Sequence, residues 1–339
     1  INVRLSDKKL DVSEAEVFRQ LDYLNGYLDG IREEAVNDFI DLLHLADFRW
    51  SLDLEGEPVA LHRLMEGYSS ENALKDSQIQ TALDYMSWFK EVRSFGLEKL
   101  APEYMRHIRK GSDLLRERKE ISIKSYFTNL TLYTAPQGLS VLMPLRADLN
   151  NCLKDISNQS TLKQLSLIHL HLRAMAPFND FNGLVARAYT LLSLRLIGLN
   201  YDFIPLSWAI AKKREQYQTL VRQSILDGKI ELWVAFMFEL FETAVRKLII
   251  QLKSMLRLKR KLKDQLTKYT AYDLPVGLVE VLMKQPYIKT AHLVAAIGCH
   301  RHTAYTYLNH LVAMGVLIEK VSGREKLFLH KELFDLVND

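Results

Sequence analysis

The chain has 339 residues, of which 48% are hydrophobic and 25% charged, the balance of a soluble globular protein, and its length favours two domains. Because it contains only 14 Gly and 8 Pro, helix is expected to dominate over sheet, and an all-β fold is not expected. The formal net charge of +4 is too small to indicate nucleic-acid binding by itself. Cys152 and Cys299 lie far apart, so we expect no disulfide or zinc site and a cytoplasmic setting. No apolar run approaches the roughly 18 residues of a membrane helix, and the charged start is unlike a signal peptide.

The N-terminal part of the chain is helical by its hydrophobic pattern. Segments 13–31, 33–52 and 76–92 carry apolar residues at helical spacing, and Ser13 with Glu16 predicts a capping box at the first of them. Residues 121–138 are rich in β-branched and aromatic residues and end in turn residues, which predicts a small β-hairpin. A further helix is expected from about 140 to 154.

Two central segments are expected to form buried helices. Residues 161–175 (TLKQLSLIHLHLRAM) and 186–199 (ARAYTLLSLRLIGL) are apolar around most of a helical circumference, which places them at the centre of a bundle. Helices from about 205 to 263 complete it. The basic run 246–263 is interpreted as the solvated face of a long connecting helix. The segment 267–275 (TKYTAYDLP) breaks the pattern and predicts a domain boundary.

The C-terminal residues have the order of a winged helix-turn-helix. Helical patterns at 274–285, 289–298 and 299–317 precede two β-rich runs joined by a Ser-Gly turn, and the sequence resembles that family directly. The resemblance implies DNA contacts by the start of the third helix and by the wing, with Arg301, His302, Thr303, Tyr305 and Thr306 at base edges and Arg324 and Lys326 at phosphates. Winged helices also serve as dimerisation modules, and this alternative stays open.

The stretch between the two central helices carries a recognisable motif. Residues 176–187 read APFNDFNGLVAR, and 169–175 lead into them as HLHLRAM. Together they resemble the signature of the Fic family, H-x-x-[F/L]-x-x-I followed by H-P-F-x-[D/E]-G-N-[G/K]-R-x-x-R. The positions that match are His169, Leu172, Met175, Pro177, Phe178, Asp180, Asn182, Gly183 and Arg187. Residues 205–241 resemble the helices that follow the motif in that family.

The resemblance implies transfer of the AMP part of ATP to a hydroxyl of a target protein. The motif histidine would be the general base and the acid, Asp180, would hold Mg²⁺. The Asn182–Gly183 turn with the helix start after it would bind phosphate, as would Arg187. This sequence departs at three positions, because Ala176, Phe181 and Leu184 replace the base, the first glycine and the first arginine. Phe181 stands where the backbone approaches phosphate and where a positive φ can be needed.

No other histidine is expected to replace the base. His169 lies seven positions before Ala176, about 10 Å along a helix axis, and His171 points to another side. Loss of a general base costs about 10²–10⁴-fold in rate. An engineered change would account for Ala176 alone, whereas natural loss of activity accounts for all three replacements.

A second family element lies upstream. Many Fic proteins carry an inhibitory helix with [S/T]-x-x-x-E-[G/N], and Ser51, Glu55 and Gly56 fit it. The resemblance implies that Glu55 pairs with Arg187 and blocks a phosphate position. The alternative is that Glu55 is a surface residue, since this short pattern also arises by chance.

These observations predict a mainly α fold: a helical Fic-type bundle with a small β-hairpin flap and a C-terminal winged helix-turn-helix. The expected segments are 1–97 with the inhibitory-type helix, 98–265 as the Fic-like core and 270–339 as the winged helix. The first hypothesis is a pseudoenzyme that acts as a regulator or scaffold and binds ATP and Mg²⁺ weakly or not at all. The alternatives are an adenylyltransferase with altered chemistry and an interaction protein without a ligand. DNA, an unknown protein target or a second copy of the chain are the expected partners.

Overall fold

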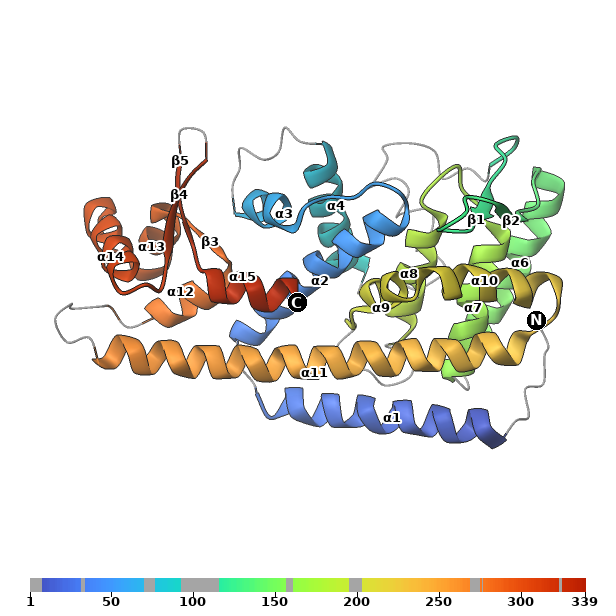
Figure 1. Cartoon of the computed structure of the whole chain (residues 1–339), viewed down its shortest axis with the longest axis horizontal. Coiled ribbons are helices and arrows are strands. Elements are labelled where there is room, and N and C mark those ends of the chain that lie inside the picture. Colours follow the sequence, from blue (N-terminus) through green and yellow to red (C-terminus); the bar gives the residue numbers. More distant parts are fainter. Residues whose placement is uncertain are drawn as a thin grey trace. The chain divides into compact units, whose positions relative to one another are not determined.

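The computed structural model describes residues 8–31, 34–69, 77–92, 116–156, 161–194, 203–268, 275, 277–322 and 325–339. In this part of the chain the fold is mainly helical with small antiparallel sheets, which confirms the predicted fold class (Figure 1). The contacts divide the chain into two compact units. Unit 1 comprises residues 1–30, 47–58 and 81–247, and unit 2 comprises 31–46, 59–80 and 248–339. The division into three sequence segments stays a prediction.

Three helices form the N-terminal part of the chain. They are α1 (Lys8–Asp29), α2 (Glu34–Leu54) and α4 (Ser77–Val92). Two of them, α2 and α4, contribute residues to both units. Helix α1 buries Leu10, Val17, Leu21, Leu24 and Leu28, a stripe at the spacing the sequence predicted. The predicted capping box at its start was wrong, because Ser13 lies inside a helix that already includes Lys8.

The centre of unit 1 is a group of helices around two buried ones. They are α6 (Leu139–Ile156), α7 (Leu162–Met175), α8 (Asn182–Ser193), α9 (Leu206–Lys212), α10 (Arg214–Leu226) and the first part of α11 (Ile230–Lys268). Every residue of α8 is buried, as the apolar pattern of 186–199 predicted, although residues 195–199 of that segment lie outside the described residues. Trp233 is fully buried and donates its Nε1–H to the Ser166 carbonyl at 2.7 Å, so α11 and α7 are joined by packing and by a hydrogen bond.

A short hairpin lies beside the end of α7. Strands β1 (Ser122–Lys124) and β2 (Thr131–Thr134) pair antiparallel, which confirms the predicted hairpin. The Tyr133 hydroxyl donates to the Ala174 carbonyl at 3.0 Å, and Glu215 of α10 accepts from the Tyr126 amide at 2.7 Å. A side chain of β2 and a backbone amide of the turn after β1 therefore fix the hairpin to α7 and α10.

Unit 2 combines parts of α2 and α11 with the C-terminal elements. The others are α3 (Leu61–Tyr68), α12 (Leu278–Lys284), β3 (Tyr287–Ile288), α13 (Thr290–Ile297), α14 (Arg301–Ala313), β4 (Ile318–Ser322), β5 (Glu325–Leu329) and α15 (Lys331–Asn338). The strands form a sheet in the order β3-β5-β4 with antiparallel pairing. Strand β3 and helix α15 were not predicted. A two-residue strand is too short for a sequence pattern, whereas α15 has an amphipathic pattern that buries Leu333 and Val337.

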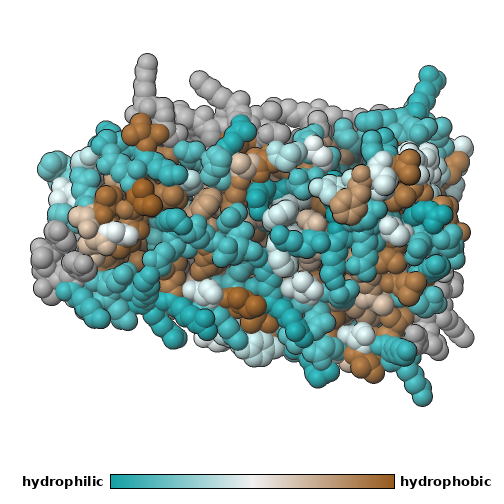
Figure 2. All heavy atoms as spheres, viewed as in Figure 1, coloured by the Kyte–Doolittle hydropathy of each residue, from teal (hydrophilic) through white to brown (hydrophobic). Residues whose placement is uncertain are grey.

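The surface is mostly hydrophilic on the face that Figure 2 shows, with hydrophobic residues in separate small groups. Large exposed apolar side chains concentrate around the hairpin and the first turns of α6, including Tyr126, Phe127, Leu130, Val141 and Met143. Among the helices that the structure describes, none has both the length and the hydropathy needed to cross a bilayer.

Candidate functional site

The motif loop, residues 176–181, joins α7 to α8 through two left-handed residues. Ala176 ends α7 with φ 40° and ψ 64°, and its N–H donates to the Leu172 carbonyl at 3.0 Å. Phe181 precedes α8 with φ 54° and ψ 24°. A residue other than glycine pays about 1–2 kcal/mol for this conformation. The backbone thus retains a positive φ at the position of the replaced glycine, and the buried Phe181 ring offsets the strain by packing.

Two polar side chains fix the loop. Asn182 bonds to both backbone groups of Phe178, accepting from the amide and donating to the carbonyl at 2.8 Å each. Arg116, only 1% exposed, donates its Nε–H to the Ala176 carbonyl at 2.7 Å, and its own amide donates to the Pro177 carbonyl at 2.9 Å. A cation here satisfies carbonyls that the end of α7 leaves unpaired. The sequence gave no signal for Arg116, which lies 60 residues before the atom it binds.

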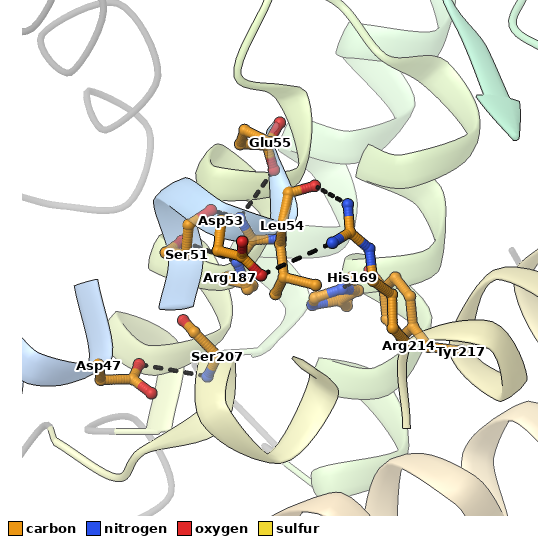
Figure 3. A network of polar contacts seen from close by, with 10 residues as sticks. All are labelled: Asp47, Ser51, Asp53, Leu54, Glu55, His169, Arg187, Ser207, Arg214 and Tyr217. Carbon is orange, nitrogen blue, oxygen red and sulfur yellow. Dashed lines mark hydrogen bonds and ion pairs between the residues drawn. The ribbon is translucent and has the colours of Figure 1, made fainter. Parts of the chain in front are cut away.

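The last turn of α2 brings Glu55 and Ser51 to Arg187 of α8 (Figure 3). The Glu55 Oε1 accepts from Arg187 Nη2 at 2.7 Å, while the Ser51 hydroxyl accepts from Nε at 2.8 Å and the Ser51 carbonyl from Nη2 at 3.0 Å. The side chains of Arg187 and Glu55 are only 3% and 13% exposed. The ion pair implied by the family resemblance is therefore present, although its inhibitory role stays a prediction.

Gly56 explains why the motif ends in glycine. It has φ +85°, and its amide donates to the Asp53 carbonyl while the Glu57 amide returns to the Leu52 carbonyl, both at 3.0 Å. This is the left-handed helix termination that glycine adopts without steric cost. It ends α2 just where the Glu55 side chain must turn toward Arg187.

Two further contacts hold the end of α2, and the sequence did not reveal them. Asp47 accepts from the Trp208 and Ser207 amides at 2.8 and 3.2 Å, which satisfies free donors at the start of α9. Burial raises the pKa of Asp47 to about 6, although these hydrogen bonds oppose the shift. Arg214 of α10 donates to the Leu54 carbonyl at 3.3 Å and lies 3.6 Å from Asp53, as Figure 3 shows.

An open cavity of about 290 Å³ lies between these elements and the hairpin. Its lining includes the cations Lys119, Lys124, Arg173, Arg187 and Arg214, and two carboxylates, Glu55 and Asp180. Asn182 also lines it, and its role in phosphate binding stays a prediction. The excess of positive charge suits an anionic ligand.

Charged side chains approach the α8 backbone closely at Gly183. A Cβ on this residue would lie 2.4 Å from Glu55 Oε1 and 2.9 Å from Arg187 Nη1. The Glu55 carboxylate therefore occupies the place beside the helix start where an anion would bind. Asp180 lines the same cavity, and one carboxylate together with substrate phosphates is a usual Mg²⁺ donor set. The chemistry of these residues is compatible with a nucleotide and Mg²⁺, whose binding stays a prediction.

The position of the general base holds no titratable group. Ala176 is 3% exposed and carries only a methyl group. His169 is fully buried, with Nδ1 bonded to the Thr190 hydroxyl at 2.8 Å and Nε2 to the Tyr217 hydroxyl at 2.7 Å. Its burial, with the nearby Arg173 and Arg187 charges, holds the pKa of His169 well below its ordinary value. His171 bonds instead to the Leu145 carbonyl at 3.1 Å, so neither histidine is free at the cavity.

The residues predicted to contact DNA lie on α14 and on the β4–β5 hairpin of unit 2. Arg301 and His302 are exposed in the first turn of α14, followed by the half-buried Thr303 and Tyr305. Lys326 is engaged within the chain, because its Nζ lies 2.7 Å from Glu319 and donates to the Tyr305 hydroxyl at 3.0 Å. Arg324 lies outside the described residues.

Comparison with known proteins supports the class that this geometry defines. Residues 257–333 match the family model described as the C-terminal domain of SoFic-like protein adenylyltransferases. The whole chain is similar to the crystal structure of a Fic family protein from Desulfovibrio desulfuricans G20. The TM-score is 0.60 at 16% identity, over 95% of this chain and 96% of that chain.

The fold and the motif loop thus define a Fic-type helical domain that ends in a SoFic-like C-terminal segment. The structural likeness shows the fold, and the family-model match applies to residues 257–333.

Proposed function

We propose that the chain is a cytoplasmic Fic-family protein that has lost AMP-transferase activity and acts as a regulator or scaffold. The observation that carries this proposal is the base position, where Ala176 has no proton acceptor and the nearby His169 uses both ring nitrogens in buried hydrogen bonds. A target hydroxyl at the loop would find no general base there. Phe181 and Leu184 are buried hydrocarbon side chains, so neither supplies a replacement for the general base.

In the proposed function the motif site retains weak nucleotide binding that Glu55 opposes. The support is the ion pair of Glu55 with Arg187, which neutralises a cation that phosphate would need, and the carboxylate beside Gly183. Without transfer activity, this contact acts as a structural latch that joins α2 to α8.

The test is calorimetric titration of ATP with Mg²⁺ into the unaltered chain and into a Glu55→Gly form. We expect binding that is measurable in the variant and weaker or absent in the unaltered chain. Neither form is expected to transfer labelled AMP to itself or to a protein mixture. Transfer of labelled AMP would instead establish the alternative, an adenylyltransferase with altered chemistry. Absence of ATP binding in both forms would leave an interaction protein without a nucleotide.

For the C-terminal segment we propose a winged helix that binds DNA or forms a homodimer. The order α12, α13, α14, β4 and β5 supports it, and Gly298 and Gly315 adopt the positive φ that the turns around α14 require. Exposed Arg301 and His302 favour DNA, whereas the Lys326–Glu319 ion pair reduces the positive charge of the β-hairpin.

A binding assay of the full chain with duplex DNA separates these two roles. If DNA binds, affinity should fall as salt rises, because phosphate contacts release counterions. An Arg301→Ala change should weaken binding, while Lys331→Ala, which removes an exposed lysine on α15, should have a smaller effect. Concentration-dependent dimerisation without DNA binding would favour the dimerising role.

A further inference from the structure

The cavity contains an arginine that the family motif does not include. Arg173 lies in the last turn of α7 and lines the cavity together with Arg187. Leu184, at the position of the missing motif arginine, is 1% exposed and packs in the core. Arg173 of α7 therefore adds a positive charge, from outside the motif, to that of Arg187 at this end of α8.

The Arg173 side chain is placed for a ligand that is not part of the chain. Its Nε is buried and has no hydrogen-bond partner among the described residues. Its guanidinium lies 6.0 Å from the centre of the Tyr217 ring, a weak contact for a cation. A buried donor without a partner costs about 1–3 kcal/mol. An anion in the cavity would remove this cost.

The atoms around Gly183 show where that anion would bind. A Cβ on Gly183 would lie 2.6 Å from Arg173 Nη1 and 2.9 Å from Arg187 Nη1, with Glu55 Oε1 at 2.4 Å. Two guanidinium groups and one carboxylate thus converge on the backbone at the first turn of α8. Carboxylate and phosphate oxygens use the same donors, namely guanidinium N–H groups and free amides at a helix start.

We propose that Arg173 is a phosphate-binding residue of this site and that, with Arg187, it supplies the cation that Leu184 lacks. When Glu55 withdraws, a phosphate group of a nucleotide takes the place of its carboxylate between the two arginines. This inference rests on the proposed function, in which the site retains nucleotide binding.

The experiment compares ATP–Mg²⁺ titrations of the Glu55→Gly chain and of the same chain with Arg173→Ala. Loss of a charge-assisted hydrogen bond should weaken binding about 10-fold to 100-fold. Arg173→Lys should recover part of the affinity, because it restores the charge without the fork of donors. The matched control is Arg222→Ala, which removes an arginine of α10 paired with Asp227 at 3.2 Å outside the cavity, and its affinity should not change.

A second measurement separates binding from folding. Because Arg173 Nε is buried without a partner, Arg173→Ala should not lower the unliganded melting temperature, while it reduces the stabilisation by ATP. Equal ATP affinity with and without Arg173 would overturn this inference and leave the proposed nucleotide site intact. No ATP binding by the Glu55→Gly chain itself would contradict the nucleotide site, and the role of Arg173 with it.

Discussion

Replacing Glu55 by Gln tests whether the Glu55–Arg187 contact stabilises the protein. The amide oxygen of Gln can still accept from Arg187 Nη2, and both Ser51 acceptors remain, so the change removes charge and leaves the geometry nearly the same. In the variant this hydrogen bond still involves a charged group, but the buried Arg187 cation loses its counter-charge; removing a whole partner of a buried pair costs about 3–5 kcal/mol, and the retained hydrogen bond offsets about 1.5–3 kcal/mol of that. The expected loss is therefore about 1–2 kcal/mol in the free energy of unfolding.

This loss is larger than expected for a surface ion pair because both side chains are almost fully buried, at 3% and 13% exposure. Urea unfolding at pH 7 measures it, and the melting temperature should fall by about 2–4 °C per kcal/mol. The control is Glu239→Gln, whose partner Lys213 and own side chain are 31% and 50% exposed, and which should cost about 0.5 kcal/mol or less. If Glu55→Gln is no more destabilising than this control, the latch is not formed in solution.

Three further changes test the site. Gly183→Ala should displace Glu55, since the new Cβ would lie 2.4 Å from Oε1, and should abolish ATP binding even in a Glu55→Gly background, as titration would show. Asp47 has a raised folded pKa of about 6, so its ionisation destabilises the fold progressively from pH 4 to 7. Relative to Asp47→Asn, the unaltered chain should lose up to about 3 kcal/mol over that range in urea unfolding. The pKa of His169 is lowered, so the neutral histidine contributes its full share to the stability of the fold above pH 6.5. Its NMR signals should therefore not titrate between pH 8 and 6.

Much of the fold followed from hydrophobic spacing. The pattern predicted α2, α7 and α8, including the burial of α8 on all sides, because a helix that is apolar around its circumference must lie in a core. Boundaries were less reliable. Helix α12 begins at Leu278, later than the apolar pattern indicated, since Gly277 at φ 91° precedes it. Strand β3 was missed because two residues give no detectable period.

The candidate site was only partly predictable. The motif identified the residues of one contiguous loop, and the second motif named Glu55 as the partner of Arg187, whereas the Ser51 bonds to Arg187 came from the structure. Neither motif indicated a role for Arg116 or Asp47, whose side chains bond to backbone atoms 60 and 161 residues away. Contacts of this kind depend on the path of the chain in space and leave no local period in the sequence.

The sequence by itself determined what chemistry the loop lacks. The Ala176 side chain has no group that accepts or donates a proton in any conformation, and the Leu184 side chain carries no charge in any fold. Both losses are therefore properties of residue type. Only the tertiary structure decided what remains: which carboxylate neutralises Arg187, and that Arg173, outside the motif, lies beside Gly183. The physical reason is that charge is fixed by composition, whereas the pairing of charges depends on distance and burial, which arise only when distant helices pack together.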